Sequence, residues 1–173
     1  MPERPTTTPP DLRGALDPHL FREGMSRVAG AVHIVATDGQ AGRAGFTATA
    51  VAPVTDQPAS LLVCINAAGR SARSVQANHA FSVNTLSAGD QAIADIFAGR
   101  AGLEGRDRFS VGSWDTLETG CPVLTTGLVA FDCRLMDSRL VATHFVIIGE
   151  IVAIRLGQAA PALVYSNRSY HAL

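Results

Sequence analysis

The run G-F-T-A-T-A-V at residues 45–51 begins an apolar segment with small side chains and two hydroxyl groups. Because Thr47 and Thr49 are not bulky, nearby backbone N–H groups can approach an aromatic ring or a phosphate, and the hydroxyls can form short hydrogen bonds. An ordinary β-branched strand edge beside a glycine turn is the alternative interpretation. The run therefore predicts a strand, and small residues such as Ala48 and Ala50 suit a surface for a flat ligand.

Six β-rich runs, separated by Gly, Pro, Asn or Asp, dominate the chain. They cover residues 31–37, 45–54, 60–66, 80–86, 128–136 and 145–156. Helical patterns are confined to 71–78 and 89–98, so helices do not alternate with strands as a doubly wound parallel sheet requires. The pattern predicts a mainly β fold, built as an antiparallel barrel or sandwich.

The N-terminal part divides into an arm and a helix. Residues 1–16 begin with a stretch rich in proline, threonine and charged residues, which is typical of a flexible arm. Asp17 is a suitable N-cap before Pro18, so a helix is expected to start there and to pack on the sheet. We expect one domain over residues 17–173. The apolar residues of the helix are Leu20, Phe21, Met25 and Val28.

Composition excludes several classes of function. The chain has 173 residues, of which 47% are hydrophobic, and a formal net charge of −1. No apolar run reaches the roughly 18 residues that cross a bilayer, and no basic patch suggests nucleic acid. The apolar surplus instead indicates a homo-oligomer. Lysine is absent, which rules out Schiff-base chemistry and a P-loop contact.

The three cysteines are widely spaced and follow no secretory leader, which favours a reducing cytoplasm. Cys64 and Cys133 lie in apolar runs and are expected to be buried, whereas Cys121 precedes a proline and is expected to be the exposed thiol. None is assigned a catalytic role. The histidines are too scattered for a metal site, so no metal is predicted.

A polar cluster follows the run at 60–66. Asn66 ends the strand, and Arg70 and Ser71 follow just as a helix begins. Ser71 can cap that helix, whose N–H groups would then face an anion, with Arg70 or Arg73 adding charge. The residues predict a phosphate or ribityl site, with simple capping as the alternative. Asn84, in the alternating run 81–86, could bind a ligand or only end its strand.

Two further segments carry candidate ligand contacts. His144 stands at the start of an apolar strand, where it can donate to a ligand or stack on a planar ring. Arg168 and Tyr170 lie two residues apart and form either a closing clamp or a packed tail. His33 is expected to be a core histidine. The glycines at 39, 42 and 45 do not follow the G-x-G-x-x-G spacing, so the Rossmann fingerprint is absent.

Taken in order, the motifs resemble the flavin reductase-like family, which includes the small reductase components of two-component flavin-dependent monooxygenases. The resemblance extends from about residue 21 to residue 173. It is carried by F-R at 21–22, G-F-T-A-T-A-V at 45–51, C-I-N at 64–66 with Ser71, F-S-V-N-T-L at 81–86, R-F at 108–109, C-P-V-L at 121–124, T-H-F-V-I-I-G-E-I at 143–151 and R-S-Y at 168–170.

The resemblance implies a six-stranded antiparallel split β-barrel of the FMN-binding, Greek-key type, with a few flanking helices, in a homodimer. It implies an enzyme that transfers hydride from NADH or NADPH to FMN, with FAD as the alternative flavin, and passes the reduced flavin to an oxygenase. Such transfer needs orientation and electrostatics rather than an acid or a nucleophile. The absence of a catalytic triad or paired carboxylates agrees with it.

The same resemblance assigns roles to individual residues. His144 would lie beside the nicotinamide. The residues that would contact the flavin are Thr47, Ala48, Thr49 and Ala50 at the ring, Asn66, Arg70 and Ser71 at the ribityl phosphate, Phe81 and Asn84 at the pocket floor, Arg108 and Phe109 from the long loop, and Tyr170 as a cover. Two alternatives remain: a flavoprotein reductase of another acceptor with tightly held FMN, and a non-catalytic flavin- or haem-binding protein.

Overall fold

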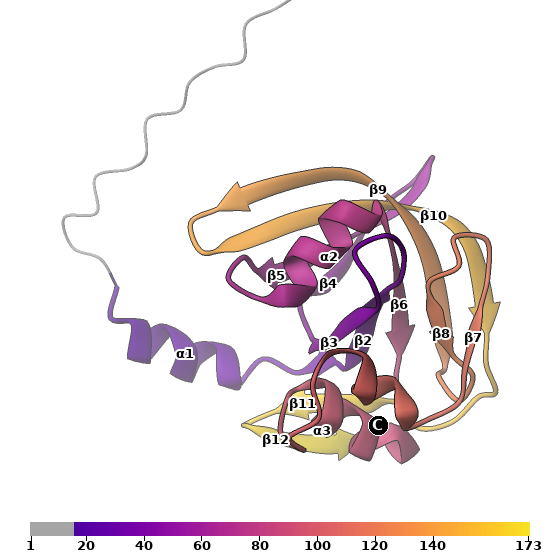
Figure 1. The fold of residues 1–173 in the computed structure, drawn as a ribbon. Helices are drawn as coiled ribbons and strands as arrows, with labels where there is room; N and C mark the ends of the chain where they lie inside the picture. Colours follow the sequence, from indigo (N-terminus) through magenta and orange to yellow (C-terminus); the bar gives the residue numbers. More distant parts are fainter. Residues whose placement is uncertain (1–15) are drawn as a thin grey trace, which may run out of the picture.

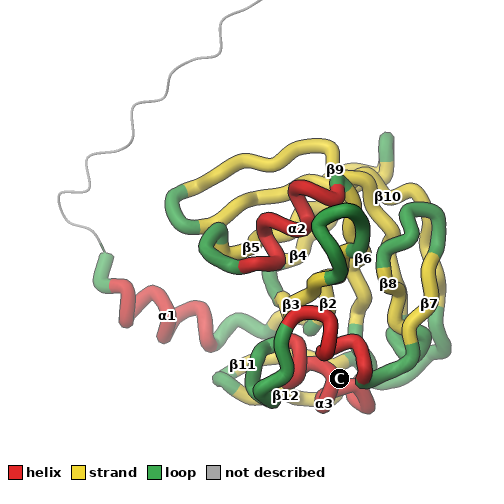
Figure 2. The backbone as a smooth tube through the Cα atoms, in the orientation of Figure 1, coloured by secondary structure: helices red, strands yellow, loops and turns green. Residues whose placement is uncertain are grey.

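The structure, a computed structural model, describes residues 16–173 and is dominated by one seven-stranded sheet (Figures 1 and 2). Every neighbouring pair in this sheet is antiparallel. The mainly β, antiparallel prediction is therefore confirmed. In order across the sheet, the strands are β3 (Ala44–Ala48), β2 (His33–Thr37), β6 (Ala80–Thr85), β9 (Val129–Val141), β10 (His144–Leu156), β5 (Ala59–Asn66) and β4 (Val51–Asp56).

The predicted run at 45–54 is divided into two strands. Thr49 and Ala50 interrupt the ladder, and the chain passes through them from one edge strand of the sheet, β3, to the other, β4. The two edges must therefore converge at this link. Within residues 16–173 no ladder pairs β3 with β4, so the sheet order stays open between its edges.

Short elements cover the ends of the main sheet. Three strands form a second sheet in the order β1 (Gly30–Ala31), β11 (Leu163–Ser166) and β12 (Ser169–Ala172), and β7 (Trp114–Thr116) pairs with β8 (Pro122–Leu124). The predicted helices appear as α2 (Arg70–Asn78) and as the 3-10 turn η1 (Ala88–Asp90) followed by α3 (Gln91–Phe97). A second 3-10 segment, η2 (Gly105–Ser110), lies in the long connection.

Two apolar clusters make up the core. One lies against α2 and centres on Phe81, which is fully buried. The other lies against α3, where Phe97 and Phe109 meet edge to face with ring centroids 4.9 Å apart, a favourable aromatic geometry. β3 contacts both α2 and α3. A Cβ at Gly45 of this strand would lie only 2.8 Å from the Phe97 ring. Gly45 therefore lets α3 and η2 approach the strand that carries the candidate ligand surface.

The helix α1 (Pro18–Ser26) begins as predicted, with Asp17 as N-cap accepting a hydrogen bond from the His19 N–H at 2.8 Å. It does not pack on the sheet, however, because none of its residues is buried and it stands apart from the other elements (Figure 1). Only a few polar contacts join it to the domain, among them an ion pair of Glu23 with Arg168 at 2.8 Å. The predicted arm lies outside the described residues, apart from Leu16.

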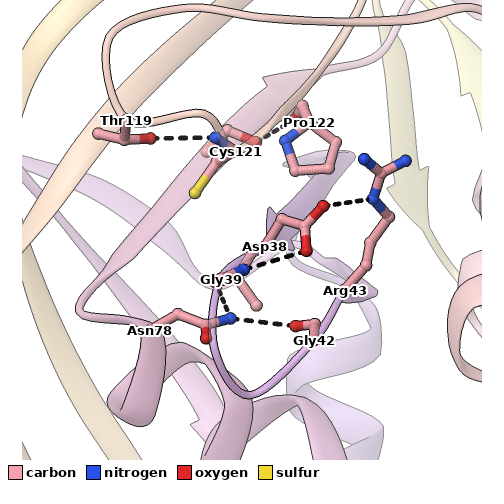
Figure 3. Close-up of polar contacts among 10 residues, drawn as sticks. Asp38, Gly39, Gly42, Arg43, Asn78, Thr119, Cys121 and Pro122 are labelled. Atoms are coloured by element: carbon pink, nitrogen blue, oxygen red, sulfur yellow. Dashed lines mark hydrogen bonds and ion pairs between the residues drawn. The ribbon is translucent and has the colours of Figure 1, made fainter.

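The burial of two cysteines differs from the prediction. Cys121 is fully buried, and its N–H donates to Thr119 Oγ1 at 3.2 Å (Figure 3). Burial raises the pKa of the Cys121 thiol, and also that of Cys133. Cys64 is half-buried and is the most exposed of the three. The exposed-thiol prediction for Cys121 was wrong because the residues after it form β8, which packs on β6.

No helix among residues 16–173 is both long and apolar enough to cross a membrane.

Candidate functional site

A cavity of about 360 Å³ lies where β3, the end of β5, the start of α2 and η2 meet. We call it the α2 cavity. Its volume falls within the range of about 300–1,000 Å³ that is usual for small-molecule sites. Its lining residues are Ala44, Gly45, Phe46, Ile65, Asn66, Gly69, Arg70, Ser71, Glu104, Gly105 and Arg108. It brings together four of the predicted residues, which lie at Asn66, Arg70, Ser71 and Arg108.

The start of α2 supplies the groups that suit an anion. The N-cap is Gly69, which has no side chain to bind the free N–H groups of the first turn. Arg70 follows as an exposed residue, and within residues 16–173 no hydrogen bond or ion pair occupies its guanidinium. Uncapped N–H groups beside a free guanidinium are the chemistry of a phosphate site.

Ser71 does not cap α2 as predicted. The helix begins one residue earlier, and the Ser71 hydroxyl donates across to the Gly45 carbonyl of β3 at 3.3 Å. Ser71 thus joins α2 to β3 in the cavity wall. Asn66 Oδ1 likewise accepts from the Ala68 N–H at 3.0 Å, which shapes the turn before the helix.

Arg108 lines the α2 cavity, but most of its donors bind the protein. Its Nε donates to the Leu103 carbonyl at 3.0 Å, and Nη1 donates to the carbonyls of Phe97 at 3.1 Å and Gly45 at 3.3 Å. Arg108 therefore holds η2 against β3 and α3. The structure places Phe109 inside the α3 cluster, where its ring packs on Phe97 instead of facing the cavity.

A second cavity of about 200 Å³ lies further along β3, and we call it the β3 cavity. It brings the predicted Thr47, Ala48 and Thr49 together with Tyr170. The Thr47 hydroxyl donates to the Ala94 carbonyl of α3 at 2.6 Å, so toward a ligand it can only accept. The other lining residues are Val32, Ala98, Arg100 and Tyr165.

Aromatic and cationic groups form the far wall of the β3 cavity. The rings of Tyr165 and Tyr170 lie 5.2 Å apart, and the Arg100 guanidinium lies 5.6 Å from the Tyr170 ring centroid. Burial raises the pKa of the Tyr170 phenol, which stays protonated at neutral pH. A ligand between this wall and Ala48 would have two tyrosine side chains on one side and a strand of small residues on the other.

Phe81 and Asn84 do not form the pocket floor that was expected. Both are fully buried in β6 and line none of the described cavities. Asn84 Nδ2 donates to the Ile34 carbonyl at 3.1 Å, and its Oδ1 accepts from the Leu124 N–H at 2.8 Å. The amide therefore joins β2 to β8. β6 is buried on both faces, so its alternating sequence does not separate a core face from a ligand face.

His144 does not line the α2 cavity, although its register partner Asn66 does. It is exposed at the first position of β10, directly opposite Asn66 of β5, and its Nδ1 lies 2.9 Å from Thr143 Oγ1. Ala50 lies beyond the β3 cavity, beside α1. His33 is half-buried, with Nδ1 3.0 Å from Thr85 Oγ1, and burial lowers its pKa to about 4.

The sequence did not identify Arg100, Glu104, Gly105 and Tyr165 as site residues. Arg100, Glu104 and Gly105 lie in the glycine-rich segment 99–127, and a connection of this length in a compact domain usually has a functional or interface role. Tyr165 lies on β11, which no sequence pattern predicted. Its pairing with Tyr170 depends on the β11–β12 hairpin and is visible only in the structure.

The structure is a mainly β domain in which cavities of about 360 and 200 Å³ lie along β3. The model of the flavin reductase like domain family matches residues 25–173, and the chain belongs to that family. The FMN reductase (NADH) RutF of Ancylobacter novellus is 45% identical over 159 residues, which cover 92% of this chain and 87% of that protein. The RutF of Enterobacter cloacae is 45% identical over 157 residues, 91% of this chain and 94% of that protein.

Solved structures share the fold. BorF, the flavin reductase component of a bacterial two-component tryptophan halogenase, superimposes with a TM-score of 0.84 at 25% identity, covering 91% of this chain and 98% of BorF. The flavin reductase PheA2 superimposes with a TM-score of 0.82 at 25% identity, covering 91% of this chain and 99% of PheA2.

Proposed function

We propose that this protein is an NADH-dependent flavin reductase that releases reduced flavin to a partner oxygenase. The observation that carries the proposal is the uncapped start of α2 with the free Arg70, placed at one end of a strand of small residues. The names of the relatives favour NADH as donor and FMN as acceptor. The two-component halogenase to which BorF belongs supports an oxygenase partner.

The residues present fit a flavin mononucleotide. In the proposed complex the first-turn N–H groups of α2 and Arg70 bind the phosphate, and Asn66 and Ser71 flank the ribityl chain. Ala48 and Thr49 lie along the ring system, and Thr47 accepts a hydrogen bond from a ligand N–H. Bound flavin supplies the acceptor for a hydride from the nicotinamide, and the chain contributes orientation.

The assay that tests the function is oxidation of NADH and of NADPH by the purified protein, with FMN, with FAD and without added flavin. We expect oxidation that saturates with added flavin and is faster with NADH. Oxidation that needs no added flavin, with flavin retained through gel filtration, would instead identify a reductase of another acceptor. Flavin binding without oxidation would contradict the enzymatic assignment.

His144 is proposed to contact the nicotinamide, because it is paired with Asn66, a residue in the wall of the α2 cavity. We expect His144→Ala to raise KM for NADH by about three- to tenfold, the effect of losing one or two weak contacts, while the flavin dissociation constant changes less than about twofold. His79→Asn is the control, because it removes another exposed imidazole but suits the left-handed backbone at that position, where φ is 55°. Unchanged kinetics in His144→Ala would limit His144 to a role in the hairpin turn.

We also propose a homodimer in which α1 packs on a second copy. Phe21 and Met25 are 57% and 52% exposed, and with Val28 they line a cavity of about 570 Å³ that reaches Thr49 and Ala50. This places the dimer contact beside the proposed ring site. A monomeric mass by light scattering would contradict it.

The three free cysteines favour a reducing cytoplasm as the compartment.

A further inference from the structure

An acidic residue lies in the wall of the cavity that is proposed to bind the flavin phosphate. Among the described residues that line the α2 cavity, Glu104 carries the one carboxylate, and Arg70 and Arg108 carry guanidinium groups. An ionised carboxylate accepts hydrogen bonds but donates none, so it repels a phosphate instead of binding it. Glu104 therefore needs a role other than contact with the phosphate.

The backbone holds Glu104 close to Arg70. On one side of Glu104, the Leu103 carbonyl accepts a hydrogen bond from Arg108 Nε at 3.0 Å. On the other side, Gly105 has a φ of +52°, a left-handed value that favours glycine, and a Cβ there would lie 3.2 Å from Arg70 Nη1. Because consecutive Cα atoms are only about 3.8 Å apart, Glu104 is anchored beside the Arg70 guanidinium.

The charges of Glu104 and Arg70 are both available for an ionic interaction. Within residues 16–173 neither side chain has a hydrogen-bond or ion-pair partner, and both residues are exposed. The Glu104 side chain is therefore free to turn toward the guanidinium whenever no phosphate is bound there. Opposite charges attract, so an incoming phosphate has to displace the carboxylate from Arg70.

We propose that Glu104 competes with the flavin phosphate for Arg70 and so keeps flavin binding weak. The proposal rests on the proposed function, which places that phosphate at the start of α2. A reductase that releases its reduced flavin has to hold it loosely, because affinity is tuned mainly through the dissociation rate. Glu104 shortens the time for which flavin stays bound without removing any group that orients it.

The test is the dissociation constants for FMN and riboflavin, measured by flavin fluorescence on the whole chain. Glu104→Gln removes the charge and keeps the shape of the side chain. We expect it to tighten FMN binding by about three- to tenfold, the modest effect of one exposed charge. Riboflavin has no phosphate, so its dissociation constant should change by less than about twofold. Raising the salt concentration should reduce the difference between the two proteins for FMN.

Two further variants separate competition for Arg70 from a general change of charge. Asp107→Asn is the matched control, because Asp107 is an exposed carboxylate of the same η2 segment and lines none of the described cavities. It should change FMN affinity by less than about twofold. In the Arg70→Ala background, Glu104→Gln should also gain less than about twofold, since no guanidinium is left to compete for.

Four results would overturn the inference. Unchanged or weaker FMN binding in Glu104→Gln would do so, and weaker binding would mean that the carboxylate accepts a hydrogen bond from a ligand hydroxyl. Equal tightening of riboflavin, an equal gain in Asp107→Asn, or a full gain without Arg70 would each overturn it as well. If the original protein binds neither flavin, the proposed function fails first. If it binds FMN and Glu104→Gln binds FMN no more tightly, only this inference fails.

Discussion

Arg70→Ala is expected to raise the dissociation constants for both FMN and FAD by about ten- to a hundredfold, the range that corresponds to losing one charge-assisted hydrogen bond of roughly 1.5–3 kcal/mol. The expectation follows from the position of Arg70 in the wall of the α2 cavity, at the uncapped start of α2. Binding can be followed by flavin fluorescence. Raising the salt concentration should weaken the original protein more than the variant.

Arg73→Ala is the matched control for Arg70→Ala. Arg73 lies one turn further along α2, is exposed, and lines none of the described cavities. Its removal alters the net charge equally but should change flavin affinity by less than about threefold. Arg70→Lys should restore part of the affinity, because lysine keeps the charge without the planar fork. Equal effects of Arg70→Ala and Arg73→Ala would mean that the general field of the helix binds flavin.

The free energy of unfolding distinguishes a ligand contact from a structural one. Within residues 16–173 the Arg70 side chain has no hydrogen-bond or ion-pair partner, so Arg70→Ala should change the free energy of unfolding by less than about 0.5 kcal/mol. Arg108→Ala should behave differently, because Arg108 donates to three backbone carbonyls that hold η2 in place. Two arginines of one cavity are thereby expected to have separable roles.

The sequence predicted the fold correctly where the hydrophobic pattern agrees with the residues that usually begin or end a helix or strand. The antiparallel sheet, α2, α3 and the N-cap of α1 all follow from such patterns. The break at Thr49 and Ala50 was not predictable, because neither residue is a glycine or a proline and both suit a strand. The β11–β12 hairpin was missed for a related reason. Its turn has positive φ at Asn167 and Arg168, where an Asn-Gly pair would have been the usual signal.

The sequence predicted several residues of the site, but it did not predict which way their side chains point. Asn66, Arg70 and Ser71 do converge on one cavity, as their polar character after an apolar run suggested, and Arg108, which the family resemblance implied, lines the same cavity. Sequence alone could not show that the Asn84 side chain hydrogen-bonds to β2 and β8. An asparagine on a strand looks the same in the sequence whether its amide faces a ligand or a neighbouring backbone. The arrangement of the strands in space decides which partner it meets.

Phe81→Ala is expected to lower the free energy of unfolding by about 3–5 kcal/mol, the usual cost of emptying a buried phenylalanine site. Phe81 is fully buried, and its ring lies over Gly149 of β10 so closely that a Cβ there would come within 2.5 Å of it. Urea denaturation measures the change. A loss of flavin affinity, with the free energy of unfolding changed by less than about 1 kcal/mol, would instead indicate that Phe81 contacts the ligand.

Gly149→Ala tests the close contact between Phe81 and β10 from the other side. Alone it should destabilise the protein by about 1–3 kcal/mol, because the new methyl group overlaps the Phe81 ring. In the Phe81→Ala background that ring is gone, while Cys133 Cβ, at 2.9 Å from the added atom, still opposes it. The double variant should therefore be less destabilised than the sum of the two single changes, by about 0.5–3 kcal/mol. Strict additivity would mean that the Phe81 side chain and a methyl group at residue 149 do not compete for the same space.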